Sequence, residues 1–285
     1  MKVKKKHIIV LAATIVLLFL IIWIAYGNAD LEINEYVVKS DNIPSEFENF
    51  RIAHISDLHN SEFGKNNEKL IDTLRQTDAD IIVITGDMID SRNTDVDVAI
   101  SLAREAVNIA PTYYVNGNHE SRIPEEYDKL KKGLVDAGVT ILENTSVDIT
   151  VGGETITLIG INDPAFRMEL VDDTMEQNIA HQLVSVIPDN DNYKVLLAHR
   201  PEYFDVYVDK VDLVFSGHAH GGQFILPFVG GVIAPGQGLF PKYYKGLYVE
   251  NNTTMIVSRG IGNSIFPFRV NNKPEIVVAK FTQSK

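Results

Sequence analysis

The chain has no cysteine among its 285 residues. This absence excludes disulfide bonds, thiolate metal sites and cysteine nucleophiles. It also lacks internal repeats, low-complexity tracts and any linker that would split the region after residue 30. With 45% hydrophobic and 22% charged residues, the composition is that of a globular protein. We therefore expect one domain over residues 31–285, preceded by a short appendage.

Positive charge is scarce outside the N-terminus. The net charge is −12, and four of the 26 basic residues lie within residues 1–26, which contain no acid. The rest of the chain therefore has 22 basic and 38 acidic residues, a net charge of −16. Such a body repels polyanions, so we expect no nucleic-acid partner. Metal binding remains compatible with it, because carboxylates are ligands and bound cations reverse the local charge.

The one long apolar run lies at the N-terminus, over residues 8–25. Its eighteen residues are enough to cross a bilayer, and Trp23 and Tyr26 fall at its far end, where aromatics favour the interface. Residues 1–7 contain four lysines, so the positive-inside rule predicts that the N-terminus is cytoplasmic. We therefore expect a cell-membrane protein with a single-pass anchor over 8–26 and an extracytoplasmic body. A signal peptide cleaved near residues 27–29 is the alternative, which the length of the run disfavours.

The body alternates strands and helices at first and becomes richer in strands later. The run at 81–84 is entirely β-branched, which is typical of a strand buried on both faces. Thr94 is the expected N-cap of a helix that ends before Pro111, and Gly138 is the expected C-terminal stop of the next one. Gly-Gly at 152–153 predicts a hairpin, whereas 221–247 is expected as a long ordered loop. This order argues for an α/β fold with a mixed sheet or two packed sheets.

Five apolar strands each end in a cluster of Asp, Asn or His, the position where α/β folds gather their sites. Each cluster is weak evidence by itself, but together they contain five of the eight histidines. Of the others, His54 is expected inside a strand in a structural role, and His181 on a helix surface. The clusters are Asp57-Leu58-His59, Gly86-Asp87, Gly117-Asn118-His119-Glu120, His199 and Gly217-His218-Ala219-His220.

Carboxylate, imidazole and amide oxygen donors without sulfur suit Mn, Fe or Zn. Seven such ligands are too many for one ion with an open position, and they suit two ions that share a bridging carboxylate. The ordered motif series, over about residues 50–260, resembles the calcineurin-like metallophosphoesterase superfamily. The segments 221–223 and 259–262 resemble a bacterial membrane-associated branch that includes phosphodiesterases.

The resemblance implies a four-layer α/β/β/α sandwich with a dinuclear centre of two divalent or trivalent ions. It assigns Asp57, His59 and His220 to the first metal and Asn118, His199 and His218 to the second, with Asp87 bridging. A hydroxide held by two cations is available near neutral pH and would attack a phosphate ester.

The resemblance also gives His119 and Asp90 catalytic roles. His119 adjoins a ligand and would stabilise the phosphoryl oxygens or protonate the leaving group, while Asp90 would orient it. Two departures are visible: Glu120 stands where many members have Asp, and Ser91 separates Asp90 from Arg92. The second makes a protein phosphatase less favoured and leaves Arg92 without a role.

The substrate hypothesis depends on the anchor and on the aromatics of loop 221–247. An anchored site with an apolar groove suits phosphodiesters of lipid or cell-wall molecules. The alternative is that these aromatics only pack the loop. A second hypothesis for the whole protein is a non-catalytic metal-binding scaffold, which the complete ligand set disfavours.

Overall fold

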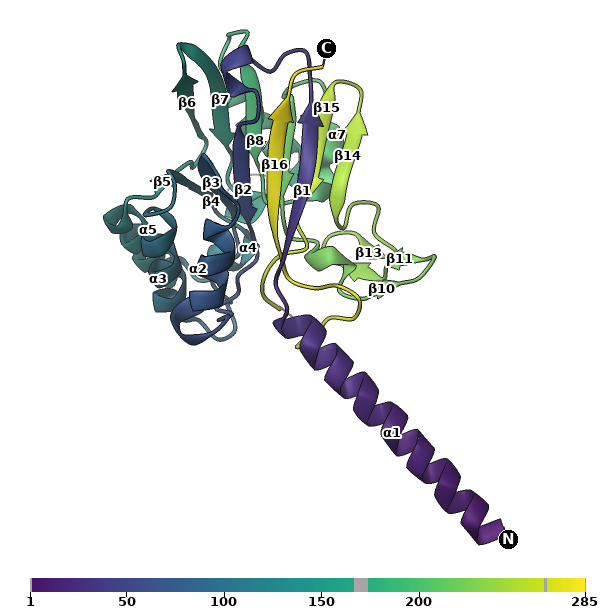
Figure 1. Cartoon of the computed structure of the whole chain (residues 1–285). Coiled ribbons are helices and arrows are strands. Elements are labelled where there is room, and N and C mark those ends of the chain that lie inside the picture. Colours follow the sequence, from purple (N-terminus) through teal and green to yellow (C-terminus); the bar gives the residue numbers. More distant parts are fainter. Residues whose placement is uncertain (1, 167–173, 264–265, 285) are drawn as a thin grey trace.

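The computed structural model describes residues 2–166, 174–263 and 266–284. Two six-stranded mixed sheets form the centre of the body (Figure 1). The first has the order β1-β16-β2-β3-β4-β5, with strands β1 (Glu32–Lys39), β16 (Glu275–Thr282), β2 (Arg51–Ile55), β3 (Ile81–Thr85), β4 (Thr112–Val115) and β5 (Thr140–Ile141). The second has the order β14-β15-β9-β8-β7-β6, with strands β14 (Gly246–Glu250), β15 (Thr253–Val257), β9 (Leu213–Ser216), β8 (Tyr193–Leu197), β7 (Glu154–Gly160) and β6 (Thr145–Val151).

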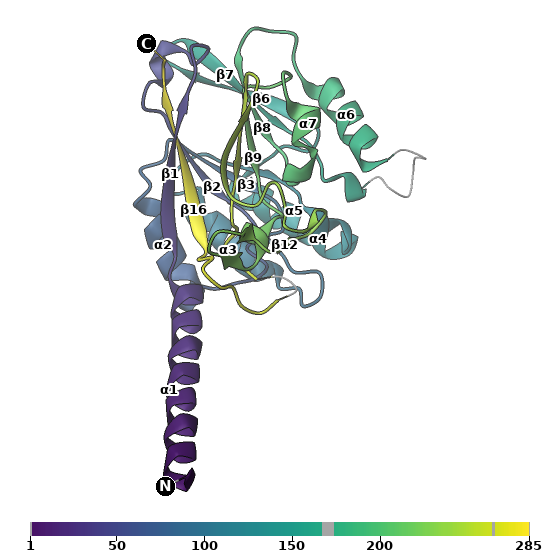
Figure 2. The same cartoon turned by 90° about the vertical axis from the view of Figure 1, so that its right-hand side faces the viewer.

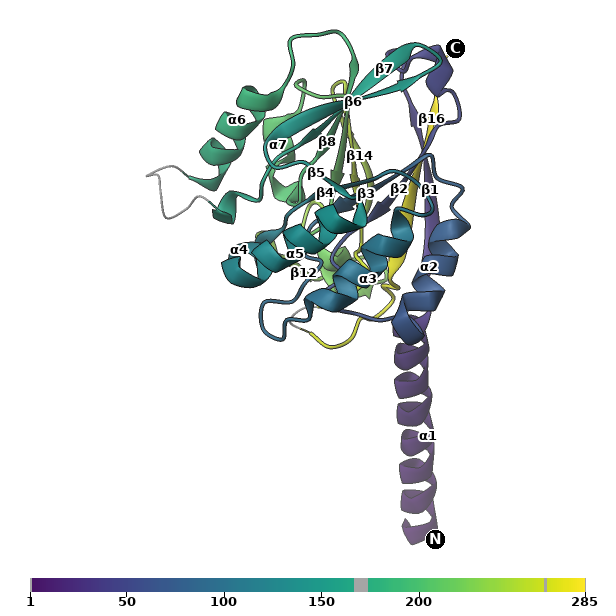
Figure 3. The same cartoon turned by 90° about the vertical axis from the view of Figure 1, so that its left-hand side faces the viewer.

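Helices cover the two outer faces of this pair of sheets. One group, α2 (Glu68–Arg75), α3 (Val96–Ala106) and α5 (Pro124–Ala137), lies on the first sheet (Figure 3). The other, α6 (Met175–Val186) and α7 (Phe204–Tyr207), lies on the second (Figure 2). The expected four-layer α/β/β/α sandwich is therefore confirmed.

Three apolar clusters fill the three spaces between the four layers. Strand β3 illustrates how the sequence divides between them: Ile82 and Ile84 face the helices, whereas Val83 faces the second sheet. Strand β9 does the same, because Phe215 lies between the sheets while Val214 packs towards α6 and α7. Side chains alternate across a strand, so a continuous apolar run buries both faces.

The chain direction brings five strand ends to one place. Strands β2, β3 and β4 are parallel neighbours in the first sheet, and β8 and β9 are parallel neighbours in the second. Their carboxyl ends meet at one edge of the sandwich, which is where the polar clusters follow. Strand β1 pairs in parallel with β16, so the first and last strands of the chain are neighbours in the first sheet.

Helix α1 (Lys2–Ala29) leaves the body as a single rod (Figure 1). Its segment Lys5–Ala29 is long and apolar enough to cross a membrane, and a signal sequence would have the same character. Among the described residues, the last turn of α1 alone forms hydrogen bonds with the body: the Asn28 side-chain amide donates to the Arg269 carbonyl at 2.9 Å and accepts from the Arg269 backbone N–H at 2.8 Å.

Local expectations met mixed outcomes. Gly138 ends α5 in the left-handed conformation (φ 100°), as predicted. The predicted cap at Thr94 is wrong by one residue, because Asp95 caps α3 by accepting from the Asp97 N–H, while the Thr94 hydroxyl donates to the Asp90 carbonyl. The expected loop 221–247 contains two small hairpins and the start of strand β14. The hairpin strands are β10 (Ile225–Leu226), β11 (Gly230–Gly231), β12 (Ile233–Ala234) and β13 (Gly238–Leu239).

The remaining elements are one short helix, α4 (Asn118–Ser121), and five single turns of 3₁₀ helix within the described residues. The turns are Ser45–Phe47, Lys65–Asn67, Pro164–Phe166, Pro201–Tyr203 and His220–Gly222.

Candidate metal centre

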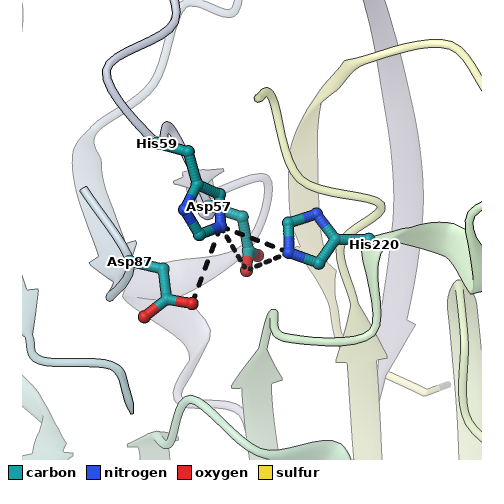
Figure 4. Close-up of side chains that lie close together, drawn as sticks. All are labelled: Asp57, His59, Asp87 and His220. Carbon is teal, nitrogen blue, oxygen red and sulfur yellow. Dashed lines mark hydrogen bonds and ion pairs between the residues drawn. The ribbon is translucent and has the colours of Figure 1, made fainter. Parts of the chain in front are cut away.

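All seven residues expected as ligands lie together beyond the carboxyl ends of β2, β3, β4, β8 and β9, and all are buried. The first group of side chains contains Asp57, His59, Asp87 and His220 (Figure 4). His59 Nε2 lies 3.2 Å from His220 Nε2 and 3.6 Å from Asp87 Oδ2. His220 Nε2 lies 3.5 Å from Asp57 Oδ1. Two carboxylates and two imidazoles thus converge on one point.

A second group contains Asp87, His199 and His218. His199 Nε2 lies 3.3 Å from Asp87 Oδ2 and 3.1 Å from His218 Nδ1. The side-chain amide of Asn118 closes this group, 2.7 Å from His218 Nδ1 and 3.3 Å from His199 Nε2. Asp87 belongs to both groups, because the same oxygen lies near His59 and His199.

Backbone strain is concentrated in these groups. Five of the seven residues have a positive φ, the left-handed region that side chains other than glycine enter at a cost of about 1–2 kcal/mol each. Strain of this kind clusters at functional sites, where the surrounding fold enforces it. The five are Asp57 (φ 54°), His59 (47°), Asp87 (52°), His218 (64°) and His220 (47°).

The electrostatics of the groups favour a cation. Asp57 and Asp87 are at most 1% exposed, and among the described residues their ion pairs are with histidines alone. Buried carboxylates without lysine or arginine partners are costly unless a metal compensates them. Burial lowers the pKa of His59, His218 and His220, which keeps these imidazoles in the neutral form that binds metals.

In the Asp87–His199 pair, the attraction between the two groups has a larger effect on their pKa values than burial has. Burial lowers the pKa of His199, but the nearby Asp87 carboxylate outweighs this effect and raises the pKa to about 10. Burial likewise raises the pKa of Asp87, and the histidines around it, His199 first, outweigh that and hold it well below its ordinary value. A metal cation between these two groups would take the place of the proton, as metal binding requires. The donor set therefore fits a metal centre.

Gly117 and Glu120 set the spacing of two loops that carry candidate ligands. A Cβ on Gly117 would lie 2.4 Å from Asp87 Oδ1, so only glycine allows this approach. Glu120 is fully buried and accepts the backbone N–H groups of Asp87, Met88 and Gly117 at 2.7–3.0 Å. It therefore joins the loops after β3 and β4.

His119 lies against the first group, with its ring centroid 4.5 Å from that of His59. Its Nδ1 accepts the Ser91 N–H at 3.1 Å, so the ring proton is on Nε2. Asp90 Oδ1 lies 3.7 Å from the same Nδ1, and the Asp90 carboxylate accepts both Nε–H (3.1 Å) and Nη2–H (2.6 Å) from Arg92. Ser91 and Arg92, which had no assigned role, thus hold His119 and Asp90 respectively.

Sequence reasoning also missed a buried chain of charges behind His218. Glu202 Oε1 lies 3.6 Å from His218 Nε2 and 3.5 Å from the Arg200 guanidinium. Neither Glu202 oxygen nor His218 Nε2 has a hydrogen-bond partner among the described residues. Arg200 in turn forms a two-bond pair with Asp163, at 2.7 and 3.1 Å. The sequence signal was the charged pair that follows His199 around Pro201.

Two cavities open beside the groups. One, of about 320 Å³, is lined by Asp87, Asn118, His119, His218 and His220 together with three arginines: Arg92, Arg122 and Arg200. The other, of about 240 Å³, is mostly apolar. Its lining residues are His220, Gln223, Ile233, Ala234, Pro235, Gly236, Gly238 and Phe266. His220, Pro235 and Gly236 line both, so the polar cleft and the apolar cavity share a wall.

The other histidines lie outside the groups, as expected. His54 is fully buried between the sheets, and its Nε2 donates to Thr85 Oγ1 at 2.7 Å. His181 is exposed on α6.

Comparison with known proteins gives concordant results. A family model described as calcineurin-like phosphoesterase matches residues 50–222. The chain is 32% identical over 255 residues to the uncharacterized metallophosphoesterase YkuE of Bacillus subtilis (strain 168), covering 87% of this chain and 84% of that one. It is 26% identical over 235 residues to the phosphodiesterase YaeI of Escherichia coli (strain K12), covering 80% and 81%. The solved structure of TT1561 of Thermus thermophilus matches with a TM-score of 0.50 and 13% identity, covering 74% and 90%, and supports the fold alone.

Proposed function

Because this chain belongs to the calcineurin-like phosphoesterase family, whose fold and hydrolase activity on phosphoric esters it shares, we propose that it is a membrane-anchored phosphodiesterase with a dinuclear metal centre. The dinuclear assignment rests on the position of Asp87, which belongs to both groups of candidate ligands. Its Oδ2 lies 3.6 Å from His59 and 3.3 Å from His199, between two groups that each offer several further donors.

The ligands divide naturally between the two ions. Asp57, His59 and His220 would hold the first, and Asn118, His199 and His218 the second, with Asp87 shared. Imidazole, carboxylate and amide donors suit Mn, Fe or Zn. Bound there, the ions would supply Lewis-acid activation of water and neutralise charge on the phosphoryl group.

The protein supplies the rest of the chemistry. His119 carries its ring proton on Nε2 and lines the polar cleft, so it would donate a hydrogen bond to a phosphoryl oxygen or to the leaving-group oxygen. Asp90, held by Arg92, lies 3.7 Å from His119 Nδ1 and would help to orient the ring. Arg92, Arg122 and Arg200 line the same cleft, and guanidinium groups match phosphate oxygens in geometry and charge.

The substrate class follows from the apolar cavity beside the cleft. A phosphoester bound at the metal groups would place one of its substituents against Ile233, Ala234 and Phe266. A diester has two substituents, of which one can be apolar and the other polar. We therefore propose an amphiphilic phosphodiester, from lipid or the cell envelope, as the substrate. Helix α1 would keep the enzyme in the cell membrane, with its N-terminus cytoplasmic and its body extracytoplasmic.

The metal mechanism is tested with the full chain purified in detergent. Turnover of bis-p-nitrophenyl phosphate and p-nitrophenyl phosphate is measured after EDTA treatment and after Mn²⁺ or Zn²⁺ addition. Asp87→Asn should lose bound metal and turnover together, and His119→Ala should lose turnover but keep the metal. Asp136→Asn, the same change on an exposed carboxylate of α5, should match the wild type. Full metal content and activity in Asp87→Asn would refute the bridging assignment, and metal binding without turnover of any diester would favour a scaffold.

The substrate class is tested on the apolar cavity. Ile233→Asp should lower kcat/KM for an acylated phosphodiester while leaving bis-p-nitrophenyl phosphate nearly unchanged. Val184→Asp, on the exposed face of α6, is the matched control. An equal fall in kcat/KM for both substrates, or no fall for either, would mean that the apolar cavity does not select the substrate.

A further inference from the structure

A group of exposed apolar side chains lies on the two small hairpins and close in the chain to Phe266, which lines the apolar cavity. It consists of Leu226, Phe228, Val229, Leu239, Phe240 and Phe268 (the apolar rim). Phe228 is fully exposed, and Leu239 and Phe240 are 66% and 63% exposed. Every exposed phenylalanine in the described part of the chain after α1 lies in this rim or at the adjoining Phe266. Contiguous exposed aromatics mark an interaction surface, whereas single exposed residues need no explanation.

The rim is tied to the end of α1. The Phe224 ring packs on Phe266 and Phe268, with centroids 5.3 and 5.6 Å apart, and the Gln223 amide donates to the Phe268 carbonyl at 2.7 Å. The backbone carbonyl and N–H of the next residue, Arg269, form hydrogen bonds with the side-chain amide of Asn28 in the last turn of α1. In Figure 1 the hairpins β10–β11 and β13 project from the body on the side towards which α1 runs. A bilayer spanned by α1 would therefore meet the rim.

Charge separates this surface from the rest of the body. Residues 213–249 contain no Asp or Glu and include Lys242 and Lys245, although the chain after residue 26 has a net charge of −16. An acidic body is repelled by anionic lipid headgroups, and an acid-free segment with two lysines is the part that can approach them. Aromatic tips flanked by lysine are also the composition of surfaces that lie in the membrane interface.

We propose that the apolar rim inserts into the headgroup and upper acyl region of the bilayer that α1 crosses. This inference rests on the proposed membrane anchor. The rim would form a second contact with the bilayer and would hold the body in one orientation. Because Phe266 lines the apolar cavity and His220 lines both cavities, a lipid phosphodiester could pass from the bilayer to the metal groups without crossing water.

The test measures contact with lipid, not catalysis, so it stays informative if the phosphodiesterase proposal fails. The chain has one tryptophan, Trp23 in α1. The full chain carrying Trp23→Phe is given one new tryptophan by Phe228→Trp, or by Leu239→Trp on the other hairpin, and is placed in lipid nanodiscs. Fluorescence is compared between ordinary lipids and lipids brominated in the acyl chains. Val184→Trp is the control, because Val184 lies on α6 and is 70% exposed, close to the 66% of Leu239.

Insertion predicts that bromination lowers the fluorescence of the tryptophans at 228 and 239 by about half, because the interface buries such side chains by roughly 5–10 Å. The tryptophan at 184 should keep its intensity. Quenching at 228 and 239 no greater than at 184 would overturn the proposal, and so would equal quenching at all three positions, which would mean that the body has no fixed orientation. Circular dichroism and thermal unfolding confirm that each variant is folded before its fluorescence is read.

Discussion

Gly117→Ala is the sharpest test of how closely the loops of the metal centre must approach. A Cβ at position 117 would lie 2.4 Å from Asp87 Oδ1 and 2.6 Å from the Asp87 backbone nitrogen, whereas ordinary contact begins at 3.4 Å. The Asp87 carboxylate must therefore move by about 1 Å. Gly117 has φ −119° and ψ −172°, an extended conformation that alanine adopts without strain, so the perturbation is purely steric.

The displacement sets the expected magnitude. A misplacement of 1 Å in a catalytic constellation costs about 100-fold in rate, which corresponds to about 2.7 kcal/mol. Stability should fall less sharply, by about 1–3 kcal/mol, as is typical of overpacking in a rigid interior. Activity should therefore drop about 100-fold in protein that is still folded at 25 °C.

The assay is kcat/KM for bis-p-nitrophenyl phosphate with saturating Mn²⁺, alongside metal content and the unfolding temperature. Gly133→Ala is the matched control, because its Cβ would lie 2.2 Å from the Ile100 side chain, which belongs to neither group of the candidate metal centre. It should lose stability and keep its kcat/KM. Gly117→Ala with wild-type kcat/KM would mean that the Asp87 position is not critical, and the reasoning from close approach would fail.

Three further outcomes are expected. Glu202→Gln removes the carboxylate that faces His218 Nε2, so metal affinity should fall about 10- to 100-fold by calorimetric titration, with wild-type affinity arguing against any orienting effect. Burial lowers the pKa of His54 to about 3, so the unfolded chain binds this proton first, and His54 alone should lower the unfolding free energy by about 1.4 kcal/mol per pH unit from pH 6.5 downwards. His54→Gln should flatten that slope in denaturant titrations, and an unchanged slope would place the titrating group elsewhere. EDTA should lower the unfolding temperature of the wild type but hardly that of Asp87→Asn, and equal shifts would deny Asp87 a part in metal binding.

The sequence could predict which side chains lie together because its signal is local. Each candidate ligand follows an apolar strand within a few residues, and the carboxyl ends of parallel strands meet in space. The run from Ile81 to Ile84 could be interpreted as doubly buried from its β-branched residues alone, and the structure confirms it. The four-layer order came from the resemblance of the whole motif series, because periodicity alone left a single mixed sheet open as an alternative.

What the sequence could not predict depends on contacts between distant residues. The parallel pairing of β1 with β16 joins Glu32 to Glu275, and no local pattern specifies a partner so far along the chain. The residues behind the ligands were missed for the same reason. Glu202 lies next to His218, and Ser91 donates a hydrogen bond to His119. These contacts arise only when the chain is folded, so no local sequence pattern predicts them.

The left-handed residues among the seven candidate ligands connect the candidate metal centre to the stability of the whole body. Five residues with positive φ, at about 1 kcal/mol each, cost about 5 kcal/mol, which is comparable to the net stability of a domain. Two buried carboxylates add to this cost. The packing of the three apolar clusters must therefore hold the strand ends in place despite this cost. Bound metal would offset much of the remaining free energy, since a ligand that binds only the folded state stabilises it. It follows that removing the metal should loosen the five ligand loops before it affects the sheets, so hydrogen exchange should rise first at Asp57, Asp87 and His218 and last in β3 and β9.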